Sequence, residues 1–396
     1  MAEPIRILHV LGNLNLGGAE SRIMDLYRNI DKSRVQFDFV IHTTKECYFT
    51  KEITSMGGRI YSVPCFKIYN YISYAKAWKK FMEEHAADYK MIQGHMTSTA
   101  SIYLPIAKKS GITTIAHARS AGVDSGLKGK VTRFMRRNLS QKADFLFTCS
   151  ELAGISVFGK KATEEGKTIF IPNAIEIDKF RFNPKTREDV RKELEIEDRF
   201  VIGHVGRFHY AKNHEFLLNV FKEVINKYDS KDDKDGKNVK DTVVDKKPLL
   251  LMLGEGPRMA EMKTLSKELG IEEDVIFAGN HSDVYRYYQG MDLFLYPSRY
   301  EGLPGTVVEA QASGLKTIMS DLICDEVIFT DLIDTMSIEK SPAEWADKVV
   351  DFIKEDKGLI NRISYNDISL KSDFNVKSQA EIMSHFYEKG ELNDNH

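Results

Sequence analysis

This sequence of 396 residues lacks the features that mark membrane-spanning, zinc-stabilised and disulfide-stabilised proteins. No apolar run approaches the roughly 18 residues that a helix needs to span a bilayer. The four cysteines are widely scattered and form no C-x-x-C pair, which argues against structural zinc or a disulfide framework and favours a reducing cytoplasm. The first residues, MAEPIRILHVLG, run directly into a strand pattern, so we expect no signal peptide there.

The two best-known glycine motifs for binding phosphate are also absent. The first glycine-rich segment, GNLNLGGAE at residues 12–20, lies between a strand pattern and a helix pattern. A P-loop would need lysine and serine or threonine where Gly18 and Ala19 stand, and the G-x-G-x-x-G spacing of a dinucleotide site does not occur. What remains is a strand-to-helix turn whose backbone can approach a ligand closely.

Charge is divided unevenly along the chain. Residues 1–180 hold 26 Lys and Arg against 17 Asp and Glu, a balance of +9, whereas the remainder holds 30 against 41, a balance of −11. The length predicts two domains, because one hydrophobic core seldom serves more than about 250–300 residues. A basic half joined to an acidic half suggests that one side meets an anionic surface or substrate.

Much of the basic excess lies in one stretch with helical spacing. It can be a solvated helix face, or it can dock on an anionic membrane surface, and the sequence leaves both interpretations open. The basic residues are Lys128, Lys130, Arg133, Arg136 and Arg137, interleaved with Val131, Phe134 and Leu139.

Short apolar runs alternate with helical patterns through most of the sequence. Such alternation predicts parallel sheets covered by helices on both faces, and hence two doubly wound α/β domains that join near residues 172–184. The predicted helices include 19–29, 71–84 and 99–110. The predicted strands are 5–11, 37–41, 59–63, 91–93, 113–116, 145–148 and 169–171, followed by 201–205, 249–253, 275–278, 293–296 and 317–319.

Residues 229–247 form a charge-rich insert with no periodicity, which predicts a surface loop. The insert contains a D-x-D at residues 233–235, but this lies in a run of solvated charges and not at a strand end. We therefore reject it as a metal ligand set.

Polar turns follow four strands of the second half, and in a parallel sheet these turns gather at the ligand-binding edge. Gly206 and Arg207 end the first strand, with Lys212 a little further on, and an arginine and a lysine can clamp a diphosphate. The other turns are GEGP at 254–257, GNH at 279–281 and the segment after residue 296. Together they predict a nucleotide-binding cleft.

The segment SRYEGLPGTVVEAQASG at residues 298–314 separates two glutamates by seven residues where a strand gives way to a helix. In one interpretation Thr306 and Glu309 form a capping box, and the glycines merely permit a tight turn. In the other, the helix N-terminus binds a phosphate, and the carboxylates accept hydrogen bonds from sugar hydroxyls.

Five segments taken together resemble the family 4 glycosyltransferases, in particular those of bacterial capsule and exopolysaccharide assembly. They are LNLGGAE (14–20), IPNAIEIDKF (171–180), VGRFHYAKN (205–213), LGEGP (253–257) and SRYEGLPGTVVEAQASGL (298–315). The resemblance implies the GT-B architecture, two Rossmann-like domains facing a central cleft. Residues 1–180 would meet the acceptor and 185–372 would hold the nucleotide sugar, while a last helix within 373–390 would cross back to the first domain. It also implies retaining transfer without a cofactor or an essential metal.

The resemblance assigns roles to individual positions. Glu309 would accept from the ribose hydroxyls and Glu301 would contact the donor sugar. The diphosphate would be held by Arg207, Lys212 and the amides of Gly305 and Thr306, with Gly17 and Gly18 approaching from the first domain. Gly254 and Asn280 join the expected donor site. Relatives often carry A-H-S-H-N where this chain has AHARS at 116–120, so His117 is the candidate for a sugar contact while Arg119 replaces a second histidine. His95 is a weaker candidate, and a strand-end histidine can also be a simple packing residue.

These observations predict a retaining hexosyltransferase in surface polysaccharide synthesis. We expect a nucleotide sugar, by family analogy a UDP-sugar, and a glycan or lipid-linked acceptor as substrates, and no nucleic acid partner. Its place would be the cytoplasm, with peripheral association with the inner face of the cell membrane. The alternatives are a GT-B epimerase acting on the nucleotide sugar and a regulatory protein that binds it without catalysis. The basic stretch argues against the first, and the intact set of Glu301, Arg207, Lys212 and Glu309 argues against the second.

Overall fold

The computed structural model describes residues 3–119, 126–230, 247–355 and 360–392, and the chain divides into two compact units. Unit 1 comprises Met1–Ile175 and Asp373–His396, and unit 2 comprises Glu176–Ser372. The sequence-based segments 1–180 and 185–372 set the division a few residues later. The D-x-D at residues 233–235 lies outside the described residues.

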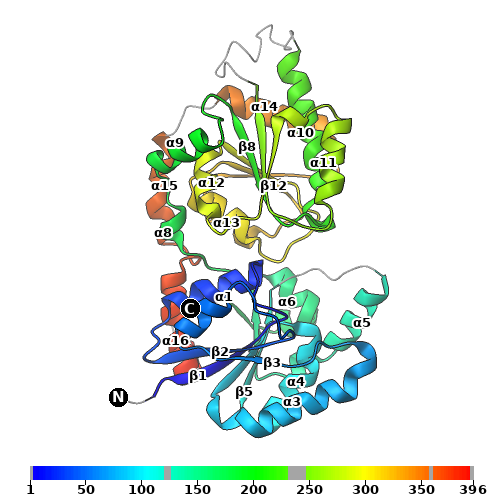
Figure 1. Ribbon diagram of the computed structural model, residues 1–396, viewed down its shortest axis with the longest axis vertical. Coiled ribbons are helices and arrows are strands. Elements are labelled where there is room, and N and C mark those ends of the chain that lie inside the picture. Colours follow the sequence, from blue (N-terminus) through cyan, green and yellow to red (C-terminus); the bar gives the residue numbers. More distant parts are fainter. Residues whose placement is uncertain (1–2, 120–125, 231–246, 356–359, 393–396) are drawn as a thin grey trace. The chain divides into compact units, whose positions relative to one another are not determined.

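Unit 1 is built on a seven-stranded sheet of order β3-β2-β1-β4-β5-β6-β7 in which every pairing is parallel. Figure 1 shows helices flanking this sheet. The strands are β1 (Ile5–Val10), β2 (Val35–Ile41), β3 (Ile60–Ser62), β4 (Met91–Gly94), β5 (Thr113–Ala118), β6 (Phe145–Thr148) and β7 (Thr168–Phe170). The helices are α1 (Gly18–Asn29), α2 (Thr50–Ser55), α3 (Tyr71–His85), α4 (Thr97–Lys109), α5 (Gly126–Arg136), α6 (Glu151–Phe158), α7 (Lys160–Glu164) and α16 (Val376–Lys389), with short 3₁₀ turns η1 (Ile68–Asn70), η2 (Ala86–Asp88) and η3 (Leu139–Gln141).

Unit 2 contains a six-stranded parallel sheet of order β10-β9-β8-β11-β12-β13 (Figure 1). Its strands are β8 (Val201–Val205), β9 (Leu249–Leu253), β10 (Val275–Gly279), β11 (Leu293–Tyr296), β12 (Thr317–Ser320) and β13 (Ile333–Met336). Its helices are α8 (Ile177–Phe180), α9 (Pro184–Glu193), α10 (His214–Asp229), α11 (Met259–Glu268), α12 (Val284–Gly290), α13 (Gly305–Ala312), α14 (Pro342–Glu355) and α15 (Ile360–Leu370), with 3₁₀ turns η4 (Tyr210–Lys212), η6 (Glu272–Asp274) and η7 (Asp325–Val327).

Central strands of both sheets are unbroken runs of buried side chains. Every residue of β2, β8, β9 and β11 is buried. A strand shows this pattern when helices cover both faces of its sheet, because neither set of alternating side chains then meets water. Each unit accordingly has its own hydrophobic core.

Helix α16 belongs to unit 1 although it follows unit 2 in the sequence. Asn375, just before the helix, pairs with Ile175 in an isolated parallel bridge, and Gln379 donates to the carbonyl of Pro172 at 2.7 Å. Phe386 and Tyr387 are fully buried in the unit 1 core, so the last helix completes the hydrophobic core of the first domain.

The predicted α/β class with two doubly wound parallel sheets is confirmed. Strands 145–148, 201–205, 249–253 and 293–296 have the predicted bounds, and the other predicted strands differ by one or two residues at an end. Strand β13 was not predicted. It lies at the edge of its sheet, and its polar residues Asp334 and Thr335 interrupt the apolar run that marks a buried strand.

Each sheet contains a point where the strand order reverses, and this is where open α/β sheets bind ligands. In unit 1 the reversal lies between β1 and β4, whose carboxyl ends are followed by Leu11 and His95. In unit 2 it lies between β8 and β11, whose carboxyl ends are followed by Gly206 and Pro297. The predicted site residues therefore gather at two structurally equivalent places.

Candidate active site

At the reversal point of unit 2 the backbones of two turns pass very close to each other. A Cβ atom on Gly254 would lie 2.2 Å from the carbonyl oxygen of Gly206, and the φ of Gly254 is +127°, a conformation that side chains disfavour. The amide of Gly254 donates to the carbonyl of Gly279 at 2.6 Å. Gly254, predicted to bind the donor, thus also holds the turns after β8, β9 and β10 together.

Lys212 follows β8 at this reversal point and is held by Tyr296, the last residue of β11, and by Glu301, which follows β11. Its Nζ is 2.8 Å from Oε1 of Glu301, and the two side chains are only 16% and 18% exposed. The same Nζ bonds to the hydroxyl of Tyr296 and lies 4.7 Å from the centre of that ring. The structure thus brings together the predicted residues Lys212 and Glu301, which are 89 positions apart in the sequence.

The charge state of this pair follows from its surroundings. Burial opposes the charge on Lys212, but Glu301 and Tyr296 together outweigh it and raise the pKa of Lys212. Burial raises the pKa of Tyr296, so this hydroxyl stays neutral. The result is a fixed ammonium group at the edge of the sheet, which suits stabilisation of a negative charge that develops nearby.

Arg207 and Asn280 lie on the same edge of the sheet but are exposed. Within the described ranges, Arg207 has no hydrogen-bond or ion-pair partner from another side chain. Arg207 immediately follows Gly206, so its backbone is anchored beside Lys212 while its side chain is available to an anion.

Helix α13 begins at Gly305, with Pro304 as its N-cap, and no side chain caps it. Val307 and Val308 donate to the carbonyl of Pro304, and in the described part of the chain the amides of Gly305 and Thr306 have no backbone acceptor. These amides and the positive end of the helix dipole suit a phosphate.

The capping-box interpretation of Thr306 and Glu309 is wrong. The helix starts one residue before Thr306, so both residues lie inside it and neither occupies the N-cap position. Glu309 is 5% exposed and accepts a hydrogen bond from the hydroxyl of Tyr288 at 2.9 Å. Tyr288 also donates to the carbonyl of Thr306, which fixes Glu309 against the first turn of its helix.

A second polar cluster lies at the reversal point of unit 1. His9 on β1 and His95 after β4 approach to 3.1 Å, and Arg119 donates to the other nitrogen of His95 at 3.1 Å. Arg119 also donates to Asn173 at 2.8 Å. His117 pairs with Gln93 at 2.8 Å, which in turn accepts from Tyr387 of α16.

The histidines of this cluster are neutral. Burial lowers the pKa of His9 to about 3 and also lowers the pKa of His95 and His117. His117 is fully buried, and its Nε2 has no hydrogen-bond partner among the described residues. Arg119 and His95 are only partly buried, so they are the polar groups of the cluster that are open to a ligand.

The glycine turn after β1 is adjacent to the same cluster. Gly17 caps α1 in extended conformation, and a Cβ on it would lie 2.4 Å from a carboxylate oxygen of Glu20. Burial raises the pKa of Glu20, with the charge of Arg119 acting in the opposite direction. Among the described residues, a Cβ on Gly18 would meet no atom within 4 Å, so this backbone is open to a close approach.

The basic stretch of residues 128–137 forms helix α5 and its C-terminal end. Lys130, Arg133 and Arg137 are exposed, and Phe134 between them is 75% exposed. Arg136 differs from these residues, because it is only partly exposed, its Nε and Nη1 are buried and burial lowers its pKa. The side chain of Lys128 lies outside the described part of the structure.

Two kinds of feature are absent from the described residues. No group of three or more His, Cys, Asp and Glu side chains is arranged to hold a metal ion, and no helix is both long and apolar enough to cross a membrane.

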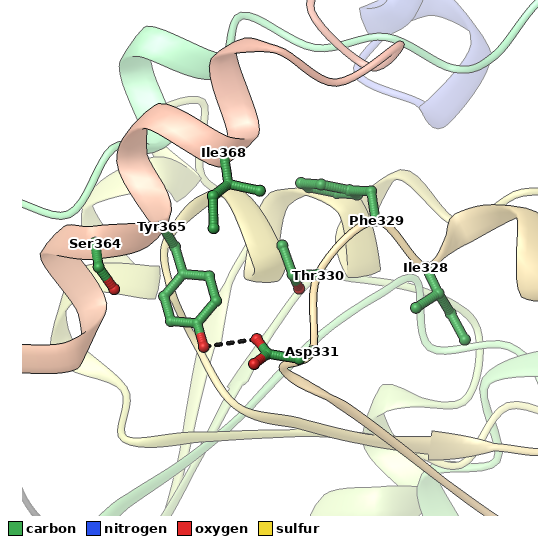
Figure 2. A pocket seen from close by; sticks show the side chains of 7 residues that line it. All are labelled: Ile328, Phe329, Thr330, Asp331, Ser364, Tyr365 and Ile368. Atoms are coloured by element: carbon green, nitrogen blue, oxygen red, sulfur yellow. Dashed lines mark hydrogen bonds between the residues drawn. The ribbon is translucent and has the colours of Figure 1, made fainter.

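A hollow of about 580 Å³ lies in unit 2, where Tyr365 of α15 bonds to Asp331 at 2.6 Å (Figure 2). It adjoins the amino end of β13, which in a parallel sheet is the edge opposite the carboxyl ends of β8 and β11.

Sequence reasoning missed the residues that hold the predicted ones in place. Tyr296 lies in the predicted apolar strand 293–296 and Tyr288 was not singled out, although they contact Lys212 and Glu309. In unit 1 it missed His9, Gln93 and Asn173. Polar residues at the ends of buried strands were the available signal for His9 and Gln93, whereas Asn173 and the tyrosines are recognisable only from contacts that are distant in sequence.

Two doubly wound parallel-sheet units define the GT-B class of glycosyltransferase fold, and solved structures of that class match this chain. The protein HepE from Anabaena, solved in complex with UDP and glucose, has a TM-score of 0.73 at 17% identity over 96% of this chain and 99% of its own. In addition, the family described as glycosyl transferases group 1 matches residues 185–369.

The chain belongs to this family of glycosyltransferases. The putative glycosyltransferase EpsF of Bacillus subtilis is 31% identical over 350 residues, which are 87% of this chain and 86% of EpsF. The capsular polysaccharide biosynthesis glycosyltransferase CapH of Staphylococcus aureus is 23% identical over 95% of this chain and 97% of CapH. An Escherichia coli UDP-Gal:alpha-D-GlcNAc-diphosphoundecaprenol alpha-1,3-galactosyltransferase is 20% identical over 76% of this chain and 75% of its own length.

Proposed function

We propose that this enzyme is a retaining glycosyltransferase of bacterial surface polysaccharide synthesis, which moves a sugar from a UDP-sugar to a lipid-linked glycan. The observation that carries the proposal is the ammonium group of Lys212, fixed by Glu301 and Tyr296 at the reversal point of unit 2. Arg207, exposed on the same edge, supplies a second cation for the diphosphate.

The donor binds on unit 2. The amides of Gly305 and Thr306 at the start of α13 donate hydrogen bonds to the diphosphate, and Arg207 and Lys212 neutralise its charge. Glu309, fixed by Tyr288, accepts hydrogen bonds from the ribose hydroxyls, and Glu301 contacts the donor sugar. Asn280 and Gly254 complete the donor-binding edge.

The chemistry requires stabilisation of the leaving group. The acceptor hydroxyl attacks the anomeric carbon on the face that the nucleotide leaves, the bond from that carbon to the phosphate oxygen breaks, and the departing phosphate takes the hydroxyl proton. Negative charge develops on the diphosphate, so Arg207 and Lys212 lower the barrier, and no cofactor or metal is assigned a part in this scheme.

Unit 1 supplies the remaining contacts. Gly18, whose Cβ position is open, allows a substrate to approach its backbone closely beside Gly17, and Arg119 contacts the substrate in place of the buried His117. The names of relatives support the substrate classes: CapH acts in capsular polysaccharide biosynthesis, and the Escherichia coli enzyme uses UDP-Gal and an acceptor linked to diphosphoundecaprenol.

We place the enzyme at the inner face of the cell membrane, where a lipid-linked acceptor would be met. The exposed side chains Lys130, Arg133 and Arg137 of the α5 region form a basic stripe, with Phe134 between them. Such a stripe suits anionic headgroups.

A panel of UDP- and GDP-sugars, incubated with the protein with and without a bacterial lipid extract, tests the proposal. We expect transfer from one UDP-sugar to a lipid-extractable product, with the anomeric configuration of the donor retained by NMR. A product that forms without any acceptor and is a different nucleotide sugar would show an epimerase. Binding of nucleotide sugars with no product under any condition would show a regulatory protein.

A further inference from the structure

Unit 1 exposes a cluster of large hydrophobic side chains around the start of α3. Ile68 is 65% exposed, Tyr69 82%, Tyr71 53% and Ile72 71%. No other stretch of five residues in the described part of the chain exposes more than one large hydrophobic side chain to this degree. We call these four residues the α3 patch. Contiguous exposed apolar surface of this kind marks a site of interaction.

The exposure of the α3 patch is fixed by its local structure. Asn70 accepts from the amide of Lys67 at 2.7 Å and donates to the carbonyl of Cys65 at 3.0 Å, which holds the η1 turn. The next residues of α3 face inward, because Tyr74 and Trp78 are fully buried. The patch side chains therefore cannot turn into the core without breaking this turn.

The charged residues nearest to the α3 patch in the sequence are all basic. Residues 53–82 contain no Asp or Glu, whereas they contain five basic residues, Arg59, Lys67, Lys76, Lys79 and Lys80. Lys76, Lys79 and Lys80 are exposed along α3, and Lys67 precedes the patch. Exposed tyrosine and isoleucine bordered by lysines match an anionic lipid surface, where the apolar groups enter the acyl boundary and the ammonium groups meet phosphates.

The α3 patch also lies at the carboxyl edge of the unit 1 sheet, where we expect substrate to bind. Tyr74, two residues after Ile72, bonds to His42 at 2.9 Å, and His42 directly follows β2. The start of α3 is therefore at the carboxyl edge of the parallel sheet, the edge that carries His95 and Arg119. Helices α3 and α5 both pack against α4 (Figure 1), so the basic stripe belongs to the same group of helices.

We propose that Ile68, Tyr69, Tyr71 and Ile72 insert into the headgroup and upper acyl region of an anionic bilayer, and so anchor unit 1 with its substrate edge at the membrane surface. This inference rests on the proposed function, in which the acceptor is lipid-linked. It adds an apolar anchor to the electrostatic attraction of α5. Binding to the membrane should therefore persist when salt screens the charges.

A tryptophan reporter tests the insertion directly. The native Trp78 and Trp345 are both fully buried, so an exposed tryptophan would report a separate signal. We expect the emission of the Tyr69→Trp protein to shift to the blue and to be quenched by vesicles of phosphatidylglycerol and phosphatidylethanolamine with brominated acyl chains. Ile363→Trp, placed at a position 51% exposed on α15 of unit 2, is the matched control and should show neither change.

A second measurement keeps the inference separate from the proposed function. The double variant Tyr69→Ser/Ile72→Ser should bind the vesicles about tenfold or more weakly at high salt, because two large apolar side chains no longer leave water. Transfer to a short-chain, water-soluble acceptor analogue, measured without vesicles, should be unchanged. If transfer persists but the reporter at position 69 is not quenched, the α3 patch is not a membrane anchor, whereas absence of transfer by the parent would contradict the proposed function.

Light scattering supplies a further check, because conversion of a dimer into a monomer by the double substitution would assign the patch to a second copy of the chain.

Discussion

Lys212 is a largely buried cation, and two neighbouring residues determine its charge and its position. Glu301 keeps it charged, and the ring and hydroxyl of Tyr296 fix its position. A lysine on a flexible stem would otherwise lose much conformational freedom on binding a diphosphate, at a cost of up to about 2 kcal/mol. Its fixed position means that little reorganisation is needed when charge develops on the leaving group.

Tyr296→Phe isolates the positioning part of this arrangement. The ring and its contact with Lys212 remain, but the hydroxyl is lost, so we expect turnover to fall by about 1.5–3 kcal/mol of transition-state stabilisation, the range for a hydrogen bond to a charged group. Donor affinity should change little. Tyr288→Phe, which removes a hydroxyl from Glu309 instead, should weaken donor binding, and equal effects of both variants on turnover alone would contradict these assignments.

Arg207→Ala tests the second cation. The side chain is exposed and makes no ion pair within the described ranges, so its loss should leave the melting temperature unchanged. Turnover should fall by about 2–4 kcal/mol of transition-state stabilisation, as for a lost charge-stabilising donor. Arg258→Ala, at an arginine that is paired with Glu261 on α11, is the control and should retain activity. Unchanged nucleotide affinity and turnover in Arg207→Ala would remove Arg207 from the mechanism.

Glu309→Gln distinguishes a ribose contact from a structural role. The structure excludes a capping box, since Glu309 lies inside α13 and bonds to Tyr288. We expect a clear loss of donor affinity by calorimetry with a small change in melting temperature, because glutamine can still accept from the tyrosine but offers the ribose one acceptor oxygen instead of a carboxylate. Equal donor affinity for variant and parent would leave Glu309 as a structural residue.

At the scale of the element, helix α5 has the predicted basic stripe, but not every basic residue of the stretch belongs to it. The stripe of Lys130, Arg133, Phe134 and Arg137 follows helical spacing, but Arg136 turns inward. We therefore expect Lys130→Gln/Arg133→Gln/Arg137→Gln to weaken flotation with anionic vesicles at low salt by about 3 kcal/mol, at roughly 1 kcal/mol per basic residue.

The control for the α5 stripe removes the same number of charges elsewhere on unit 1. Lys160, Lys161 and Lys167 are 60–87% exposed and pair with nearby glutamates, so their replacement by glutamine should have little effect on flotation. Equal losses in both triple variants would mean that total charge, and not the stripe, governs binding. No flotation of the parent at low salt would leave α5 as a solvated helix face.

Sequence patterns predicted most elements because each reports a local preference. Buried strands such as Leu249–Leu253 are continuous apolar runs, and their bounds were predicted correctly. Edge strand β13 contains Asp334 and Thr335, so its pattern carries no such signal. The capping-box interpretation implied a helix that begins after Thr306, because Gly305 looks like part of a turn, whereas α13 begins at Gly305.

The candidate site was predictable to a smaller extent. Residues such as Lys212 and Glu301 stand in recognisable segments, and their pairing at 2.8 Å follows from the adjacency of β8 and β11, which no local pattern encodes. The same holds for Tyr387, which reaches Gln93 from 294 residues away. Contacts between elements that are distant in sequence become visible only in the fold.

At the scale of the whole molecule, both units bury histidines close to their strand-reversal points. In unit 1, burial lowers the pKa of His9 to about 3 and that of His42 to about 4, and in unit 2 it lowers the pKa of His204 to about 4. The corresponding pKa in the unfolded chain is about 6.5. Because the folded pKa is the lower one, the unfolded chain binds more protons as the pH falls, so the stability present above about pH 6.5 is lost between that value and about pH 4.

This linkage predicts that the protein loses stability in mild acid. At about pH 5 each histidine with a folded pKa near 4 should cost about 2 kcal/mol of the free energy of unfolding, while ordinary carboxylates remain largely ionised. Glu20, whose pKa is raised by burial, acts in the opposite direction as a single group. Urea denaturation between about pH 7.5 and 5 should therefore show a falling midpoint, with a shallower slope for His9→Phe, whose ring site is already packed against Phe37 at 4.2 Å. A midpoint independent of pH over this range would show that the buried histidines are protonated in the folded protein.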